Sequence, residues 1–252
     1  MGKVISIVNN KGGVAKTTTA FNLSCALSRL GKRVLMIDLD PQSSLTIYCG
    51  LEPLELKKSI YDVLTNHCEA KDALMNSPIE GIDIIPASID LSAAEVEIVG
   101  KIGREFILSD KLAPVVEGYD YIVIDNSPSL GVLTVNSLIA SDYVISPSEP
   151  TYLALRGLEI LTSTINQVVS FNGKLKFMGV LITMYDPRTS HHAEVIEELK
   201  KSYPTFKTMV KRSIRFSDSC LSSQSIFDYA GDSFAGAQAY LDFAKEVIDY
   251  AG

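Results

Sequence analysis

The feature that most constrains the fold lies near the start of the chain, where an apolar run leads into a glycine-containing loop. Residues 4–8 predict a buried strand, and the loop covers residues 10–18. Apolar residues then recur at helical spacing over residues 19–30, and Gly31 supplies a stop. In a unit of strand, glycine turn and helix N-terminus, backbone N–H groups and the helix dipole bind polyphosphates. The unit therefore predicts an α/β fold with a phosphate site.

The loop carries two lysines where an ordinary phosphate loop carries one. Lys16 stands where it would reach the β- and γ-phosphates, and the Thr17 hydroxyl would ligate Mg²⁺. Asn10 and Ala15 replace the two glycines of G-x-x-x-x-G-K-[ST], so the loop fits K-G-G-x-x-K-[ST]-T instead. Lys11 is the informative residue, because a second cation near the phosphates exceeds what one site needs for binding. The predicted nucleotide-binding residues of the loop are Lys11, Gly12, Gly13, Val14, Ala15, Lys16, Thr17 and Thr18.

Two later strands end in carboxylates. The first, residues 33–37, runs into Asp38 and Asp40, which share one side of an extended chain, and Pro41 ends the strand. The second, residues 121–125, ends in Asp125 and has the form of a Walker B element. Acids at the carboxyl ends of parallel strands beside a phosphate loop lie where Mg²⁺ and the attacking water are held. The alternative is that these aspartates cap the turns that follow, and it applies most to Asp38.

Together, these segments resemble the ParA/Soj branch of the deviant-Walker-A ATPases, relatives of MinD and the nitrogenase iron protein. The matching segments run nearly end to end: KGGVAKTTT, DLDPQSSLT, IDIIPASIDLSAAEVE, YDYIVIDNSPSLGVLTVNSL and GVLITMYDPRT. The chain departs from the family's usual residues at Ala15, at Ser43 and Ser44, at Asn126 and Ser127, and at Lys211. The first three departures bear on the hydrolysis rate, and Lys211 bears on how the adenine is held.

The resemblance implies that two subunits close face to face around two ATP molecules. Lys11 would act in trans on the partner's nucleotide, and Lys16 would act in cis. Asp40 would orient the attacking water, so the implied catalytic residues are Lys11, Lys16 and Asp40. The implied metal residues are Thr17, Asp38, Asp40 and Asp125, with Asp38 supporting the lysine and Mg²⁺ network. Met184 and Lys211 are the expected nucleotide contacts outside the loop.

Strands alternate with helices to the end of the chain, which predicts one domain over residues 1–252. The expected fold is a doubly wound, mostly parallel sheet with helices on both faces. The predicted strands are residues 3–8, 33–37, 82–86, 121–125, 143–147, 177–183 and 208–210, and a helix over residues 235–250 closes the chain. Four dispersed cysteines suit reduced thiols, and no signal peptide or membrane-spanning run is apparent, so we expect a cytoplasmic protein.

Charge is distributed unevenly along the chain. The formal net charge is −7, yet residues 200–215 hold six basic residues and no acid. Basic residues so gathered can neutralise DNA phosphates, although they can also be a solvated surface. By resemblance, Arg188 and Arg215 match positions used for sequence-independent DNA binding, and Lys211 and Arg212 lie in the same region. We therefore expect an ATP-dependent homodimer that binds double-stranded DNA of any sequence on the nucleoid, with a ParB-like partner or cargo adaptor triggering hydrolysis.

Three alternatives belong to other functional classes. A MinD-like, membrane-attached regulator of cell division needs a basic amphipathic C-terminal helix, whereas residues 235–252 carry a net charge of −2 and an apolar stripe that suits core packing. We therefore expect no stable membrane association. A self-repressing regulator needs a helix-turn-helix ahead of the loop, which begins at residue 10. A tyrosine autokinase needs a tyrosine-rich tail, and the tyrosines here are dispersed. The cargo, whether chromosome, plasmid or another, is not encoded in any motif.

Overall fold

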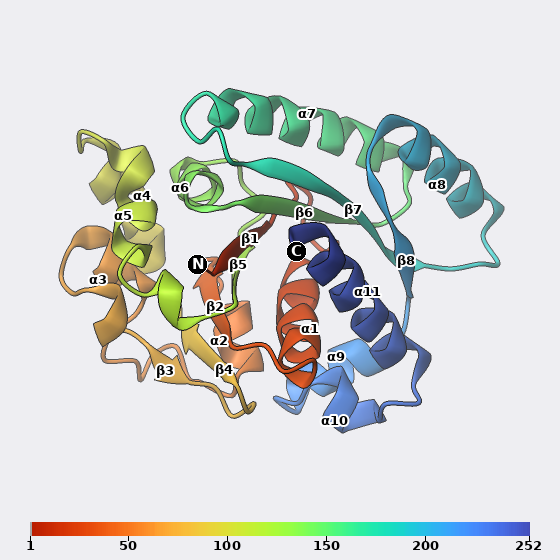
Figure 1. Cartoon of the computed structure of the whole chain (residues 1–252), viewed down its shortest axis with the longest axis horizontal. Coiled ribbons are helices and arrows are strands. Elements are labelled where there is room, and N and C mark those ends of the chain that lie inside the picture. Colours follow the sequence, from red (N-terminus) through yellow and green to blue (C-terminus); the bar gives the residue numbers. More distant parts are fainter. Residues whose placement is uncertain (1) are drawn as a thin grey trace.

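The computed structural model describes residues 2–252, which form one domain around an eight-stranded sheet (Figure 1). The strand order is β3-β4-β2-β5-β1-β6-β7-β8, and every neighbouring pair is parallel except β3 with β4. The strands are β1 (Lys3–Ile7), β2 (Val34–Leu39), β3 (Met75–Asn76), β4 (Ile82–Ile85), β5 (Tyr121–Asn126), β6 (Tyr143–Ser148), β7 (Lys176–Tyr185) and β8 (Thr205–Lys211).

Helices connect the strands and cover both faces of the sheet (Figure 1). The helices are α1 (Lys16–Arg29), α2 (Ser44–Tyr48), α3 (Ile60–Thr65), α4 (Leu91–Val99), α5 (Ile107–Leu112), α6 (Val132–Ala140), α7 (Tyr152–Val169), α8 (Ser190–Ser202), α9 (Arg215–Leu221), α10 (Ile226–Ala230) and α11 (Ala235–Ala251). Three short 3₁₀ helices are η1 (Ala70–Asp72), η2 (Arg104–Phe106) and η3 (Val116–Gly118). The predicted α/β fold, doubly wound and mostly parallel, is confirmed.

The hydrophobic core divides into clusters on the two faces of the sheet. One cluster joins α1 and α11, together with α9 and α10, to residues such as Ile5 and Met36 of the central strands. On the other face, α3, α4 and α5 pack over β2 and β5, and α6, α7 and α8 pack over β6 and β7. Successive residues of a strand point to opposite faces of the sheet, and both faces are buried here. The central strands are therefore continuous apolar runs. The sheet is therefore a rigid support for the loops at its ends.

Most element boundaries differ from expectation by one or two residues, and three differences are larger. Helix α1 begins at Lys16, three residues before the predicted start, because the loop residues Lys16, Thr17 and Thr18 already form its first turn. Strand β8 extends over Thr205–Lys211 on both sides of the predicted core. The two-residue β3, which pairs antiparallel with β4, was not predicted, since two residues carry no periodicity.

The strand order places the functional loops together. The chain passes from β1 to β2 and later returns past β1 to β6, so the direction of winding reverses at β1. In open parallel sheets, ligands bind outside the carboxyl ends of the strands at this reversal. The carboxyl ends of β1, β2 and β5 are neighbours there, with Ile7 opposite Asp125 and Asp38 also opposite Asp125. The glycine loop and both aspartate-bearing strands thus meet at one edge.

Candidate nucleotide site

The loop between β1 and α1 is held in a tight curve by its own backbone. Gly13 and Ala15 have left-handed backbone angles, with φ of 72° and 66°. The Ala15 carbonyl accepts from the Thr19 amide at 2.9 Å, which joins the loop to the first turn of α1. The Val14 carbonyl accepts from the Thr183 hydroxyl at 3.1 Å, which joins the loop to β7. A non-glycine residue in the left-handed region costs roughly 1 kcal/mol, so the fold holds Ala15 there against its preference.

Two neighbouring cavities open beside this loop, each of about 370 Å³. The first is lined by Gly12, Gly13, Ala15, Lys16, Thr17, Thr18, Asp40, Gln42, Ser44, Tyr48, Pro128 and Met184. The second is lined by Ala15, Thr18, Thr183, Met184, Val210, Lys211, Arg212, Ser213, Ile214, Phe216, Ser217 and Tyr240. They share Ala15, Thr18 and Met184, so six of the eight predicted loop residues and the predicted pair Met184 and Lys211 border one continuous region; Lys11 and Val14 line neither cavity. Met184, and Ser43 next to the lining residue Ser44, also have left-handed backbones, with φ of 51° and 54°.

Lys16 lies within the first cavity and is largely buried. Lys16 is 7% exposed, and its ammonium donates to the Lys11 carbonyl at 3.2 Å. Burial lowers the pKa of Lys16, while the negative charges of Asp125 and Asp40 act in the opposite direction. A cation confined between a glycine loop and two carboxylates is suited to binding a polyphosphate, which would add further negative charge around it.

Asp125 is the most strongly perturbed acid of the site. It is fully buried, and neither of its carboxylate oxygens accepts a hydrogen bond among residues 2–252. Burial raises its pKa well above the ordinary value, and the neighbouring charge of Asp38 acts in the same direction. Thr17 and Lys16 oppose this shift. A buried carboxylate without a partner, beside a threonine hydroxyl, fits the donor set of Mg²⁺, which takes one or two protein oxygens and fills its other positions from phosphates and water.

Asp38 and Asp40 have separate environments, although Asp38 lies in β2 and Asp40 directly follows it. Asp38 is fully buried and its Oδ2 accepts from the Thr46 hydroxyl at 2.7 Å and the Thr46 amide at 2.8 Å. Burial raises the pKa of Asp38 to about 6, and the Thr46 hydrogen bonds oppose that rise. Asp40 lines the first cavity, and its Oδ1 accepts from the Gln42 amide at 2.9 Å. Only Asp40 of this pair is therefore presented to a ligand.

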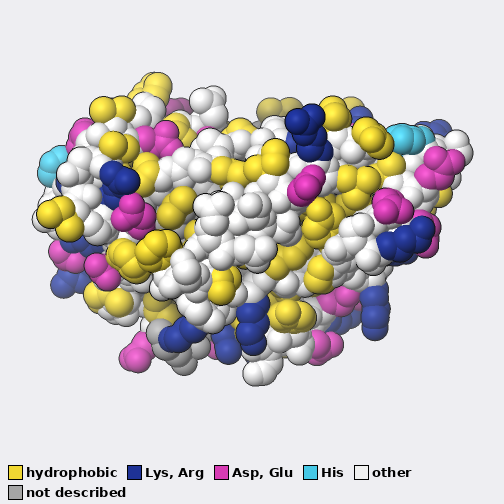
Figure 2. Space-filling view, turned by 90° about the horizontal axis from the view of Figure 1, so that it is seen from above, with side chains coloured by type: hydrophobic (Ala, Val, Ile, Leu, Met, Phe, Trp, Pro, Cys, Tyr) yellow, Lys and Arg dark blue, Asp and Glu magenta, His cyan; other side chains and the backbone are white. Residues whose placement is uncertain are grey.

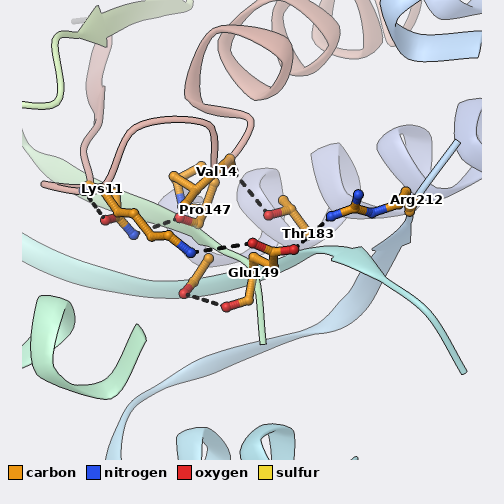
Figure 3. A network of polar contacts seen from close by, with 8 residues as sticks. Lys11, Val14, Pro147, Glu149, Thr183 and Arg212 are labelled. Atoms are coloured by element: carbon orange, nitrogen blue, oxygen red, sulfur yellow. Dashed lines mark hydrogen bonds and ion pairs between the residues drawn. The ribbon is translucent and has the colours of Figure 1, made fainter. Parts of the chain in front are cut away.

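Lys11 is not among the residues that line either cavity. Its ammonium instead reaches Glu149 Oε2 at 3.4 Å, as Figure 3 shows. The other oxygen of Glu149 accepts from Arg212 Nη2 at 2.7 Å, so one carboxylate lies between two cations (Figure 3). Glu149 was not predicted from the sequence. The rule that selected Asp40 and Asp125, an acid at the carboxyl end of a parallel strand, also applies to Glu149, which directly follows β6.

Acids that lie just outside the predicted basic segment accompany its first lysines. Lys200 and Lys201 on α8 pair with Glu197 and Glu198 of the same helix at 3.4 and 3.6 Å. Figure 2 shows acidic and basic side chains interleaved at the end of the molecule that carries α8. The sequence count of six basic residues without an acid therefore overstates the positive charge of this surface, because the helix places Glu197 and Glu198 beside the lysines.

The candidate DNA-binding residues cluster beyond the carboxyl ends of β7 and β8. Tyr185 pairs with Lys211 across these strands, Arg188 lies in the loop after β7, and Arg215 begins α9. Arg188 is 88% exposed and is held by Asp186 through contacts of 2.7 and 3.0 Å. This ion pair lowers the pKa of Asp186. The Arg215 guanidinium packs over the Phe234 ring at 4.9 Å.

The C-terminal helix α11 buries its apolar side against the body of the protein. Tyr240, Phe243, Ala244 and Val247 are fully buried, and α11 packs against α1 and β8. The Tyr240 hydroxyl lies 3.3 Å from the Thr19 hydroxyl of α1, directly behind the phosphate loop. The expected core-packing role of this helix is thereby confirmed. Within residues 2–252, the helices are all too short or too polar to cross a membrane.

Comparison with known proteins places this geometry in a family. Residues 2–177 match the AAA domain family. The chain is 44% identical to the sporulation initiation inhibitor protein Soj of Bacillus subtilis (strain 168) over 98% of both chains. It is 38% identical to the chromosome partitioning protein ParA of Myxococcus xanthus (strain DK1622), over 98% of this chain and 88% of the relative.

Among solved structures, cobyrinic acid a,c-diamide synthase from Mycobacterium smegmatis, with bound ADP and magnesium, superposes on this chain with a TM-score of 0.89. It is 37% identical, and the match covers 100% of this chain and 96% of that one. The match to Soj extends over nearly the whole length of both proteins, and the fold and the lysine-rich loop agree with it. The chain therefore belongs to the AAA domain family and, within it, to the Soj/ParA group of partition ATPases.

Proposed function

We propose that this protein is an Mg-ATP-dependent partition ATPase whose ATP-bound dimer binds DNA of any sequence. The observation that supports the proposal is that the two loop lysines lie in different places. Lys16 lines the cavity, whereas Lys11 lies outside it with a side chain that is 39% exposed. A phosphate-binding loop that turns one of its two lysines outward has a cation to offer to a second subunit. The binding of ADP and magnesium by the M. smegmatis relative supports the choice of ligand.

Within one subunit, the phosphates would lie along the loop amides of Gly12 and Gly13, at the start of α1. Lys16 would hold them in cis from a buried position, where burial lowers its pKa and the charges of Asp125 and Asp40 oppose that shift. Thr17 and Asp125 would hold Mg²⁺. The metal would neutralise charge on the phosphate oxygens as hydrolysis proceeds. Lys11 of the partner would add a second cation to the same phosphates.

Asp40 is the group best placed to orient the attacking water. It is the only one of the three aspartates that lines the cavity, and the Gln42 amide fixes its carboxylate. We assign Asp38 a supporting role instead, because its oxygens are occupied by Thr46 and the Asp40 amide. The base would lie in the second cavity between Met184 and Lys211. Lys211 would contact it through the methylene groups of its side chain.

The dimer links ATP to DNA through the number of phosphate contacts. Arg188, Lys211 and Arg215 occur once per subunit, and a dimer presents them twice. Because counterion release depends on the number of neutralised phosphates, doubling this surface raises DNA affinity steeply. Hydrolysis would separate the subunits and release the DNA. A ParB-like protein or cargo adaptor would trigger that step, and we propose that the protein works on the nucleoid in the cytoplasm.

The test is a mobility-shift experiment on unrelated duplexes, with and without ATP, across a salt series. Arg188→Glu with Arg215→Glu should abolish binding and leave ATP-driven dimerisation intact. Arg188→Ala with Arg215→Ala is a milder double variant that removes four arginines from the dimer. At roughly 0.9 per phosphate contact, it should reduce the slope of log affinity against log salt by about 3 to 4. A matched control, Lys57→Glu with Lys71→Glu, changes the same charge at two exposed lysines in the segment between α2 and β3.

Two outcomes would contradict the proposal. DNA binding that persists unchanged in the double arginine variant would place the surface elsewhere. Liposome flotation without DNA binding would favour the MinD-like alternative. The apolar residues of α11 are packed against α1 and β8, so this helix does not offer the apolar face that a membrane anchor needs.

A further inference from the structure

We infer that Glu149 is a positioning residue for Lys11: it holds the lysine on its own subunit and sets how readily the protein dimerises, while Arg212 takes over the carboxylate when Lys11 leaves. The inference rests on the proposed function, since it needs Lys11 to reach a partner's nucleotide. It concerns a residue that the sequence patterns did not select. Figure 3 shows the arrangement, with Glu149 between the two cations.

The loop that carries Lys11 is fastened beside Glu149 by neighbouring contacts. The Lys11 amide donates to the Asn9 side chain at 2.9 Å, and Asn9 donates to the Pro147 carbonyl at 2.8 Å. The side chain of Asn10 packs on Gly157 of α7, where a β-carbon would lie 2.8 Å from the Asn10 oxygen. These contacts join the start of the phosphate loop to the end of β6 and to α7. The fold therefore places the Lys11 backbone beside Glu149, within reach of the 3.4 Å contact between the two side chains.

Glu149 is too enclosed to lose both partners without cost. Its side chain is 18% exposed, whereas those of Lys11 and Arg212 are 39% and 63% exposed. Removing one partner of an enclosed ion pair leaves a charge that is poorly solvated, and this is a larger penalty than the loss of an exposed pair. Lys11 can leave Glu149 at moderate cost only because Arg212 remains 2.7 Å from the other oxygen.

Arg212 therefore has a role other than the one that its position in the basic segment indicated. An arginine that must stay on Glu149 in the dimer is withdrawn from DNA contact. Its planar guanidinium suits this duty, because it remains charged and can shift to engage both carboxylate oxygens. Glu149 opposes the transfer of Lys11 to the partner, and Arg212 facilitates it.

The test measures the dimer dissociation constant by sedimentation velocity over a range of protein concentration, with a non-hydrolysable ATP analogue and Mg²⁺. The variants are Glu149→Gln, Arg212→Ala and the two combined. Glu159→Gln, an exposed carboxyl group of α7, is the charge-matched control. Melting temperatures show that each variant is folded, and Glu149→Ala provides a second removal of the carboxylate should glutamine perturb the loop.

We expect Glu149→Gln to tighten the dimer about 25-fold, because each subunit breaks one ion pair worth roughly a factor of five. Arg212→Ala should weaken the dimer, since the release of Lys11 would then leave Glu149 unpaired. In the combined variant this weakening should vanish, and the dimer should be as tight as in Glu149→Gln. A purely structural role of Glu149 would not produce this dependence of one substitution on the other.

The inference is overturned if Glu149→Gln leaves the dissociation constant unchanged or raises it. It is also overturned if Arg212→Ala has the same effect with and without Glu149. Both results presuppose an unaltered protein that dimerises with the ATP analogue. If the unaltered protein stays monomeric at every concentration, the proposed function itself fails, so the two failures are distinguishable.

Discussion

Replacing Asp125 by asparagine should stabilise the protein in the absence of metal and remove its response to Mg²⁺. Asp125 is fully buried, its two oxygens accept no hydrogen bond among residues 2–252, and it is opposite Asp38 on the neighbouring strand β2. Asparagine has nearly the same shape without the charge. The substitution therefore removes an electrostatic penalty and leaves the packing of β5 unchanged.

The size of the gain in stability follows from the hydrogen-bond partners that the Asp125 carboxylate lacks. A buried group of this kind without a partner costs on the order of 2 kcal/mol or more, and the Lys16 charge offsets part of the cost here. We take about 2 kcal/mol, which corresponds to a rise in melting temperature of roughly 4 to 8 °C for a domain of this length. The gain should appear in EDTA without nucleotide.

The sign of the pH dependence follows from the direction of the pKa shift. The folded-state pKa of Asp125 is raised above the ordinary value of 3.8, so the folded protein binds more protons than the unfolded chain between these two pKa values. Stability of the unaltered protein therefore falls as pH rises through that window. The advantage of Asp125→Asn should be smallest near pH 4 and should grow as the pH is raised.

The assay is urea unfolding or thermal melting in EDTA and in Mg-ATP, across a pH series. Saturating Mg-ATP stabilises a folded protein by about 2.7 kcal/mol at one hundred times its dissociation constant, and the variant should lose most of that increment. Asp249→Asn, an exposed aspartate of α11, is the control. If Asp125→Asn lowers the stability in EDTA, then Asp125 has a structural partner and the metal assignment is wrong.

The remaining predictions concern the loop and the attacking water. Lys11→Ala should keep ATP binding, because Lys16 and the loop amides remain, but should lose the ATP-dependent dimer; a normal dimer in sedimentation would refute the trans role. Asp40→Ala should bind ATP, dimerise and stay on DNA while turnover falls by about 100-fold or more, and failure to bind ATP would make Asp40 a metal or structural residue. Ala15→Gly should raise the melting temperature by about 2 to 4 °C, because glycine accepts the left-handed backbone at φ of 66° at roughly 1 kcal/mol less cost, and an unchanged value would show that the loop is not strained.

Local patterns were sufficient to predict the sheet and to select most residues of the candidate site. Apolar runs located every strand except the two-residue β3. The pattern of acids at strand ends selected Asp40, which lines the first cavity, and Asp125, whose charge acts on Lys16 of the loop. Glu149 was missed because its two ion-pair partners, Lys11 and Arg212, lie 138 and 63 residues away in the chain. The same difficulty affected the basic segment. Lys200 and Lys201 seemed unopposed only because Glu197 and Glu198 fall just outside the counted window.

The left-handed residues around the nucleotide site bear on how fast the protein exchanges its ligand. Ala15, Ser43 and Met184 are held in these conformations by bonds of the chain itself, such as those from the Thr19 amide to Ala15 and from the Ser43 amide to Asp40. Their conformational cost is met when the protein folds, so it is not deducted from nucleotide affinity. Loading of nucleotide then requires no slow reordering of these loops. Under the proposed function, the duration of each ATPase cycle would then be set by how long the two subunits stay closed.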